Sequence, residues 1–203
     1  MKYRALSVAL LMAAPLAIGV SPRAPLEGPR SAEAAVAVLI SLEDLTAASA
    51  YVVVATAGEQ RSAWEETPSG RRIVTYTRLQ VDRSVDGPAE KELWVRTLGG
   101  VVDNIGQSVS GEAQLTSGSR SMLFLARGTA GLVVAAMAQG HYPVVDGGKT
   151  SKTMSPRLAG SPDAGMLLPR RGPTISARER LVGLSLDEAV LAVQRARAVI
   201  HAK

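Results

Sequence analysis

The sequence contains no cysteine and few aromatic residues: one Phe, two Trp and four Tyr among 203 residues. Without cysteine the chain has no disulfide, no thiol nucleophile, no thiolate ligand for a metal and no cysteine for lipid attachment. Packing must therefore stabilise the fold, and the shortage of aromatic side chains predicts a core made mostly of Val, Leu and Ala.

Histidine is also scarce, and His141 and His201 are its only occurrences. Zinc sites need three or four ligands, which two distant histidines without cysteine do not supply. A serine nucleophile is commonly marked by the motif G-x-S-x-G, which this sequence lacks. The sequence therefore predicts no catalytic residue, no metal and no cofactor.

The charge of the chain is mildly positive. The formal net charge is +5, and Lys2 and Arg4 supply two of these charges in a segment that we expect to be removed, which leaves +3. A net charge of this size is too small to indicate a nucleic-acid-binding surface, and few aromatic residues lie among the basic ones to stack on bases. We expect no nucleic-acid partner.

The N-terminus has the pattern of a secretory signal peptide. Lys2 and Arg4 precede an apolar run from Ala5 to Val20, which has the length of a signal-peptide core and is short for a membrane span. We predict a signal peptide over residues 1–20 and an exported protein, periplasmic or extracellular, with an uncleaved N-terminal anchor as the alternative. Residues 21–40 contain three prolines and are expected to be a flexible lead. No later apolar run approaches the length of a membrane span.

Residues 41–145 have the pattern of a small, mainly β domain. Ser41, followed by Asp44 three residues later, predicts the start of a short helix at Leu42–Ala50. The strands expected after this helix are Tyr51–Ala57, Ile73–Val81, Leu93–Leu98, Ser121–Ala126, Leu132–Ala138 and Tyr142–Val145. No helix of crossover length separates them, so we expect an antiparallel barrel or sandwich rather than a parallel α/β sheet.

The last sixty residues are predicted to form a linker and a helix. Residues 146–184 are rich in Gly, Pro, Ser and basic residues and show no periodicity, which predicts an irregular linker. Residues 185–203 form the expected C-terminal helix, because Ser185 and Glu188 have capping-box spacing and an apolar stripe follows them.

A set of short segments in this order carries a resemblance to a known group of proteins. The segments are Tyr51-Val52-Val53-Val54, Arg72-Ile73-Val74-Thr75-Tyr76-Thr77, Gly99-Gly100, Ile105-Gly106-Gln107, Met122-Leu123-Phe124-Leu125, Gln139-Gly140 and Leu184-Ser185-Leu186-Asp187-Glu188. The chain resembles uncharacterised exported bacterial proteins, some of which occur near predicted matrixin-like metalloproteases. This resemblance implies a small OB-like β-barrel and, as a partner, an exported protein such as a metalloprotease.

The chain is also similar, more weakly, to netrin and tissue-inhibitor modules, which bind metalloproteases. Those inhibitors use an N-terminal cysteine and disulfides, and this chain has no cysteine. Their inhibitory chemistry therefore does not transfer to it, and the resemblance supplies no catalytic residue.

The segment from Gly99 to Gln107 is the candidate binding site. It combines glycines, which permit unusual backbone conformations, with apolar residues that a solvated loop would normally avoid. The candidate binding residues are Gly99, Gly100, Val101, Val102, Ile105, Gly106 and Gln107, together with Gln139 and His141. The alternative is that Val101, Val102 and Ile105 plug one end of a barrel.

Three functions are compatible with these observations. The leading hypothesis is a non-catalytic exported module that binds a protein or a cell-envelope component. The second is a structural or assembly component of the cell envelope or spore coat. The third is a hydrolase of unrecognised type built on His141.

Overall fold

The computed structural model describes residues 36–68, 70–145, 155–170 and 174–202. In chain order its elements are β1 (Val36–Val38), α1 (Leu42–Ala47), β2 (Tyr51–Thr67), β3 (Gly70–Asp86), β4 (Glu92–Leu98), β5 (Gly100–Val102), β6 (Ile105–Gln107), β7 (Arg120–Gly128), β8 (Gly131–Val134), η1 (Met137–Gly140), β9 (His141–Val145), β10 (Arg157–Leu158), η2 (Pro162–Ala164), β11 (Met166–Leu168), α2 (Ala177–Leu181) and α3 (Leu186–His201). The predicted signal peptide over residues 1–20 lies outside the described residues.

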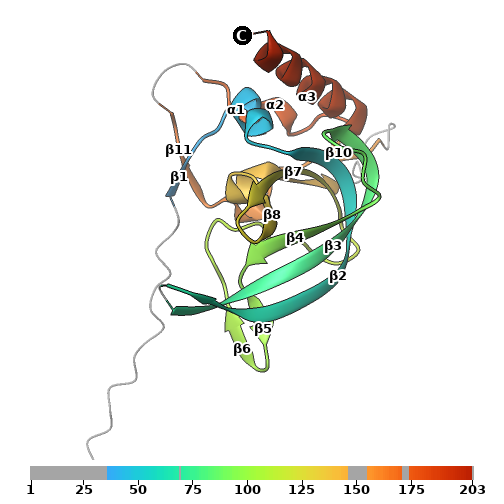
Figure 1. Cartoon of the computed structure of the whole chain (residues 1–203). Helices are drawn as coiled ribbons and strands as arrows, with labels where there is room; N and C mark the ends of the chain where they lie inside the picture. Colours follow the sequence, from blue (N-terminus) through green and yellow to red (C-terminus); the bar gives the residue numbers. More distant parts are fainter. Residues whose placement is uncertain (1–35, 69, 146–154, 171–173, 203) are drawn as a thin grey trace, which may run out of the picture. The chain divides into compact units, whose positions relative to one another are not determined.

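One seven-stranded sheet dominates the structure (Figure 1). Strand β2 pairs with β3 and with β7, β3 pairs with β4, and β8 pairs with both β4 and β7. These five strands therefore form a ring of backbone pairings, in which only the contact of Val95 with Leu132, between β4 and β8, is parallel. The prediction of a mainly β chain with a C-terminal helix is confirmed.

The chain buries side chains on both faces of β2 and β7. Because side chains alternate along a strand, Val53 of β2 and Leu123 of β7 point to one side of the sheet, whereas Val52 and Phe124 point to the other. The first side joins an inner cluster with Leu79 and Val95, and the second joins an outer cluster that includes residues of α1, α2 and α3. This double burial explains why Tyr51–Ala57 is continuously apolar.

The two longest strands extend well beyond the predicted ranges. Strand β2 continues from Ala57 to Thr67 and β3 covers Gly70–Asp86, whereas the sequence predicted Tyr51–Ala57 and Ile73–Val81. The additional residues are mostly polar and lack the alternation on which the prediction depended. Nearly all of them pair with the opposite strand of the hairpin, so the partner strand, rather than their own pattern, makes them strand.

The expectation of an irregular linker over 146–184 does not hold for its described residues. Leu158 of β10 pairs with Val144 of β9, and the side chains of Leu158 and Leu181 are fully buried in the outer cluster. The expected flexible lead also ends in ordered structure, because β1 pairs in parallel with β11. The pairing of β1 with β11 joins residues far apart in the sequence, so no local pattern predicts it.

Helices α1 and α3 begin where the sequence predicts, whereas α2 lies in the expected linker and was not predicted. Ser41 accepts a hydrogen bond from the Asp44 amide (3.0 Å), and Ser185 with Glu188 forms a complete capping box at the start of α3. The three helices contact one another (Figure 1), and Arg197 ties α3 to β3 through Asp86. Among the described residues, no helix combines the length and the apolar character needed to cross a membrane.

Candidate binding cleft

The segment that the sequence marks as a binding loop is a small β-hairpin beside a cleft. Strands β5 and β6 pair with each other, with Val101 opposite Gly106. The cleft has a volume of about 460 Å³. It lies between this hairpin, the ends of β3 and β4 and the segment 108–115, and its lining comprises Gln60, Thr75, Thr97, Leu98, Gly99, Gly100, Val101, Gly106, Gln107, Ser108, Val109, Glu112, Ala113, Gln114 and Leu115.

Two glycines allow the hairpin to lie close to its neighbours. Gly99 has φ +93°, and a Cβ atom there would lie 2.6 Å from the Gln107 carbonyl oxygen. Gly100 has φ +131°, and its Cβ atom would overlap the Thr75 hydroxyl and lie 2.6 Å from the Ser62 hydroxyl. A side chain at either position would strain the backbone and push the hairpin away from β2 and β3.

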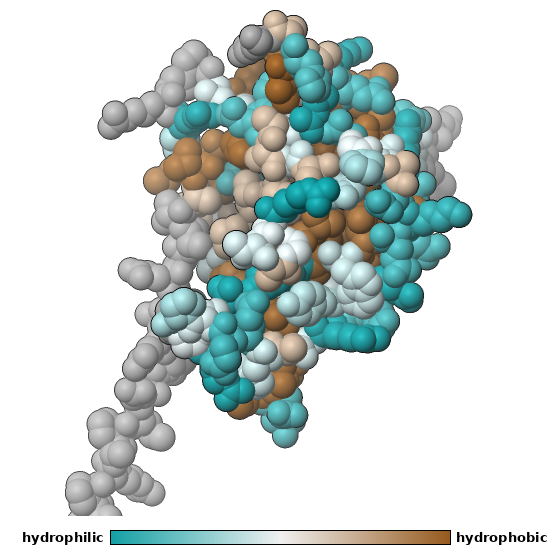
Figure 2. All heavy atoms as spheres, in the orientation of Figure 1, coloured by the Kyte–Doolittle hydropathy of each residue, from teal (hydrophilic) through white to brown (hydrophobic). Residues whose placement is uncertain are grey.

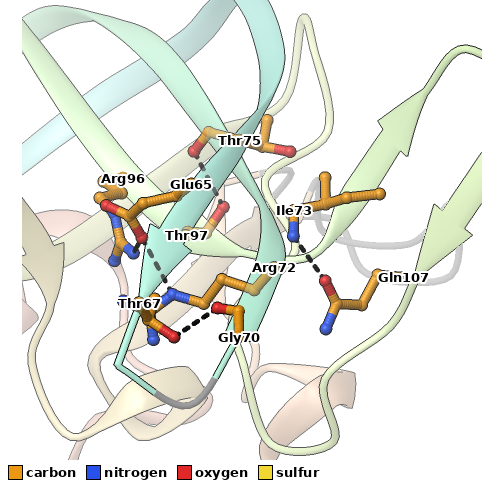
Figure 3. A network of polar contacts seen from close by, with 9 residues as sticks. All are labelled: Glu65, Thr67, Gly70, Arg72, Ile73, Thr75, Arg96, Thr97 and Gln107. Carbon is orange, nitrogen blue, oxygen red and sulfur yellow. Dashed lines mark hydrogen bonds and ion pairs between the residues drawn. The ribbon is translucent and has the colours of Figure 1, made fainter.

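Polar contacts hold the hairpin in this position (Figure 3). The side-chain oxygen of Gln107 accepts from the Ile73 amide (2.6 Å), and the Gly99 amide donates to the Ile73 carbonyl (2.8 Å). The Thr75 hydroxyl donates to the Gly99 carbonyl (2.7 Å). Strand β4 ends at Leu98, which pairs with Val74 of β3. The amide of the preceding β3 residue, Ile73, therefore donates to Gln107 instead of to β4.

The apolar residues of the hairpin face solvent. Val101 is 66% exposed and Ile105 is 56% exposed, and Figure 2 shows hydrophobic atoms on the surface over the hairpin, at the lower end of the molecule in that view. Val101 lines the cleft, whereas Val102 and Ile105 share the other face of the hairpin because they are directly paired. Val101 and Ile105 are therefore not buried as the plug of a barrel end would be, whereas Val102 is half-buried.

Glu112 is the one ionisable residue among the described residues that line the cleft. It is only 7% exposed, and none of the ion pairs formed by the described residues includes it. Burial raises the pKa of Glu112 above its ordinary value, although the Leu98 amide donates to its carboxylate and Arg96 attracts it. The cleft therefore contains a carboxyl group that forms no ion pair with the described residues.

A separate group of charges lies on β2, β3 and β4 (Figure 3). Glu65 accepts from Arg72 Nε (2.9 Å) and from Arg96 Nη2. These hydrogen bonds hold the pKa of Glu65 below its ordinary value, and the bond from Arg96 has the larger effect, followed by the bond from Arg72. Arg96 is nearly buried, and its Nε has no hydrogen-bond partner. We interpret this group as a clamp on the β2–β3 hairpin.

Gln139 and His141 do not line this cleft. Gln139 binds the lead segment, since its oxygen accepts from the Ile40 amide (3.2 Å) and its amide nitrogen donates to the Val38 carbonyl (3.1 Å). His141 is 5% exposed in the interior. Both residues line a second cavity of about 10 Å³, which is room for one water molecule.

His141 belongs to a buried polar network. Its Nε2 is 3.0 Å from Ser121 Oγ and its Nδ1 is 3.3 Å from Ser161 Oγ, while Asp163 Oδ2 lies 3.3 Å from the same Ser161 hydroxyl. Burial lowers the pKa of His141 to about 4, against the opposing charge of Asp163. Asp163 also accepts from the Gln114 amide (3.0 Å), so the network reaches the wall of the cleft.

The network joins Ser121, His141, Ser161 and Asp163 in this order, so it contains the serine, the histidine and the acid of the hydrolase hypothesis, but Asp163 reaches the histidine only through Ser161. Ser121, His141 and Ser161 are each at most 5% exposed, however, and the adjoining cavity is too small for a substrate. We therefore interpret the network as a set of structural hydrogen bonds that joins β7, β9 and η2. Within the described part of the chain, no group of three or more His, Cys, Asp or Glu residues is placed to hold a metal ion.

The structure brings together five of the predicted site residues, Gly99, Gly100, Val101, Gly106 and Gln107. Sequence reasoning missed Gln60, Thr75, Thr97 and Glu112, which line the same cleft from four different segments. No spacing rule connects these positions, because strand pairing makes the first three neighbours and the fold of the segment 108–115 brings Glu112 to them. Comparison of the chain with protein families, with curated proteins and with solved structures gave no match.

Proposed function

We propose that this chain is a non-catalytic exported module that binds a protein or peptide partner in the cleft beside the β5–β6 hairpin. The observation that carries the proposal is the cleft of about 460 Å³ with Val101 exposed on its wall. Exposed apolar residues next to a formed cleft are typical of a binding surface rather than of a solvated loop.

We further propose that the ring of paired strands is the OB-like barrel expected from the resemblance. Support comes from the order of pairings, β7–β2–β3–β4–β8, with β8 returning to β7. OB-like barrels bind ligands on one face and with the loops around it, which is compatible with a site at the β5–β6 hairpin. Export rests on the N-terminal pattern of Lys2, Arg4 and the apolar run to Val20.

The chemistry of the lining favours a polypeptide over a phosphate-rich partner. In the described parts of the chain no Lys, Arg or His lines the cleft, and its polar residues other than Glu112 are neutral Gln, Thr and Ser. A phosphate group needs cationic or amide donors, whereas a peptide is satisfied by neutral hydrogen bonds and apolar contacts. The resemblance makes an exported metalloprotease the first partner to test.

Capture experiments with Val101→Asp test the proposal. We expect the wild-type chain to retain a specific protein from an envelope extract and the Val101→Asp variant to lose it, with an unchanged melting temperature because Val101 is 66% exposed. The matched control is Val199→Asp on α3, where the valine is 47% exposed and distant in sequence from the hairpin. Equal capture by the wild type and by Val101→Asp would overturn the proposed site.

The hydrolase hypothesis is the second candidate, because Ser121 Oγ lies 3.0 Å from His141 Nε2. It predicts an activity on an ester, peptide or glycan that Ser121→Ala abolishes. Our proposal predicts no such activity in the wild type. A Ser121-dependent turnover would replace the binding proposal with the catalytic one.

A further inference from the structure

We infer that the cleft accepts a basic group, the side chain of a Lys or Arg in the partner, with Glu112 as its counter-charge and Val101 in contact with its aliphatic stem. The inference rests on the proposed function, which assigns a polypeptide to this cleft. It adds the chemical class of the side chain that enters.

The charge of the lining favours a cation. Among the residues that the structure describes, Glu112 is the one ionisable group on the lining, and no cation shares the lining with it. Arg96 attracts Glu112 but is not part of the lining, and its Nη2 donates to Glu65. At 7% exposure, Glu112 is shielded from water, so an entering cation would interact with it more strongly than with a surface carboxylate.

The hydrogen-bond donors of three side chains in the lining are already used within the protein. The Thr75 hydroxyl donates to the Gly99 carbonyl, and the Thr97 hydroxyl donates to the Thr75 carbonyl (3.4 Å). The amide nitrogen of Gln60 donates to Thr77 Oγ1 (3.2 Å) and to the Leu115 carbonyl. These three side chains have committed donors, and the oxygens that remain are acceptors, which suits an ammonium or guanidinium group. The side-chain nitrogen of Gln107 remains as a donor, because the oxygen of that side chain accepts from the Ile73 amide.

The shape of the cleft wall at the hairpin suits a long aliphatic stem. Val101 stands opposite Gly106, so one wall of the cleft carries a single aliphatic side chain with open backbone beside it. Lys and Arg have long aliphatic stems that pack on apolar surface while their charged ends reach a polar partner. A basic side chain can therefore use Val101 and Glu112 at the same time.

The test uses two peptide probes that differ in one charge, acetyl-Val-Lys-Val-amide and acetyl-Val-norleucine-Val-amide. Titration followed by NMR shifts of the Leu98, Gly100 and Gly106 amides should show that the lysine peptide binds the wild type more tightly than the norleucine peptide. Glu112→Gln should weaken the lysine peptide about tenfold, while leaving the norleucine peptide unchanged. The matched control is Asp103→Asn, which removes an equal charge from the exposed turn of the hairpin and should change neither affinity.

A pH titration of the wild type gives a second readout that needs no variant. Affinity for the lysine peptide should fall as the pH decreases through the pKa of Glu112, because protonation removes the counter-charge, while Glu65 stays ionised to lower pH. Affinity for the norleucine peptide should not change over this range.

Three outcomes would overturn the inference: equal affinity for the two peptides, an unaltered lysine affinity in Glu112→Gln, or no shift of the cleft amides with either peptide. Equal binding of both peptides that Val101→Asp abolishes would leave the proposed function intact and remove only the cation. Absence of binding here, together with equal capture of partner proteins by the wild type and Val101→Asp, would reject both.

Discussion

The backbone of Gly100 lies so close to Thr75 that a Cβ atom added at Gly100 would overlap the Thr75 hydroxyl. This contact sets the hairpin against β3 and thereby sets the width of the cleft. Gly100→Ala should therefore move the hairpin and destabilise the fold by about 1–3 kcal/mol. Urea unfolding measures the stability, and capture from an envelope extract should be lost together with it.

Gly118→Ala is the matched control for Gly100→Ala. Gly118 also has a positive φ, +80°, but nothing lies within 4 Å of its Cβ position. Gly118→Ala should therefore show only the cost of the backbone conformation, about 1 kcal/mol, and should keep normal capture. Equal effects of the two substitutions would mean that the contact with Thr75 does not position the hairpin.

Glu112 makes the stability of the fold depend on pH. Its pKa is raised in the folded chain, so the folded state holds this proton more tightly than the unfolded state. The associated stability is present below the unfolded pKa and is lost as the pH rises through the folded pKa. Compared with the wild type, Glu112→Gln should therefore be relatively more stable at pH 7 than at pH 4, as measured by urea unfolding at both values.

Glu65 should show the opposite dependence. Its pKa is lowered by hydrogen bonds from Arg96 and Arg72, so its stabilising effect is present above the unfolded pKa and is lost as the pH falls through the folded pKa. Glu65→Gln should therefore destabilise the chain at pH 7 and have a smaller effect under acidic conditions. The same direction of change for Glu65→Gln and Glu112→Gln would contradict the different environments assigned to them.

His141 should make the fold sensitive to acid. Burial lowers its pKa from 6.5 to about 4, so protonation favours the unfolded state. The stability that depends on neutral His141 is present above pH 6.5 and is lost as the pH falls toward 4, to a total of about 3 kcal/mol. His141→Gln should be less stable than the wild type at pH 7 and should lose less stability between pH 7 and pH 4.5.

Arg197 should contribute more to stability than the other cation that ties α3 to β3. Its Nε donates to Asp86 (2.8 Å) and its Nη2 to the Ser49 carbonyl (3.3 Å), and the side chains of Arg197 and Asp86 are only 23% and 20% exposed. Arg197→Met should lower the free energy of unfolding by about 2 kcal/mol, because it leaves Asp86 partly buried without its cation.

Arg83→Met is the comparison, since the ion pair of Arg83 with Asp187 is exposed, at 48% and 86%. Its loss should cost less than about 1 kcal/mol. If chemical denaturation shows the two arginines to be equivalent, the burial of the Arg197 contact does not stabilise the attachment of α3.

Local patterns predicted part of the structure that depends on residues close together in the chain, although the capping box of Ser176 and Glu179 at the start of α2 was not recognised. Ser185 and Glu188 are three residues apart and cap the same helix turn, so the start of α3 could be predicted. The apolar run after Ala50 likewise predicted a buried strand. Gly99 and Gly100 correctly indicated an unusual backbone, although a paired hairpin rather than a loop follows them.

The cleft itself depended on tertiary structure. The sequence by itself determined that the chain has no thiol chemistry, a mainly β core and a glycine-flanked apolar segment near residue 100. Only the pairing of β2, β3 and β4 placed Gln60, Thr75 and Thr97 side by side, and only the fold of the segment 108–115 brought Glu112 to them. The pairing of β9 with β7 placed His141 in a different, buried network. Hydrophobic periodicity reports which side chains are buried over a few residues, whereas the neighbours of a polar side chain are decided by strand register across tens of residues.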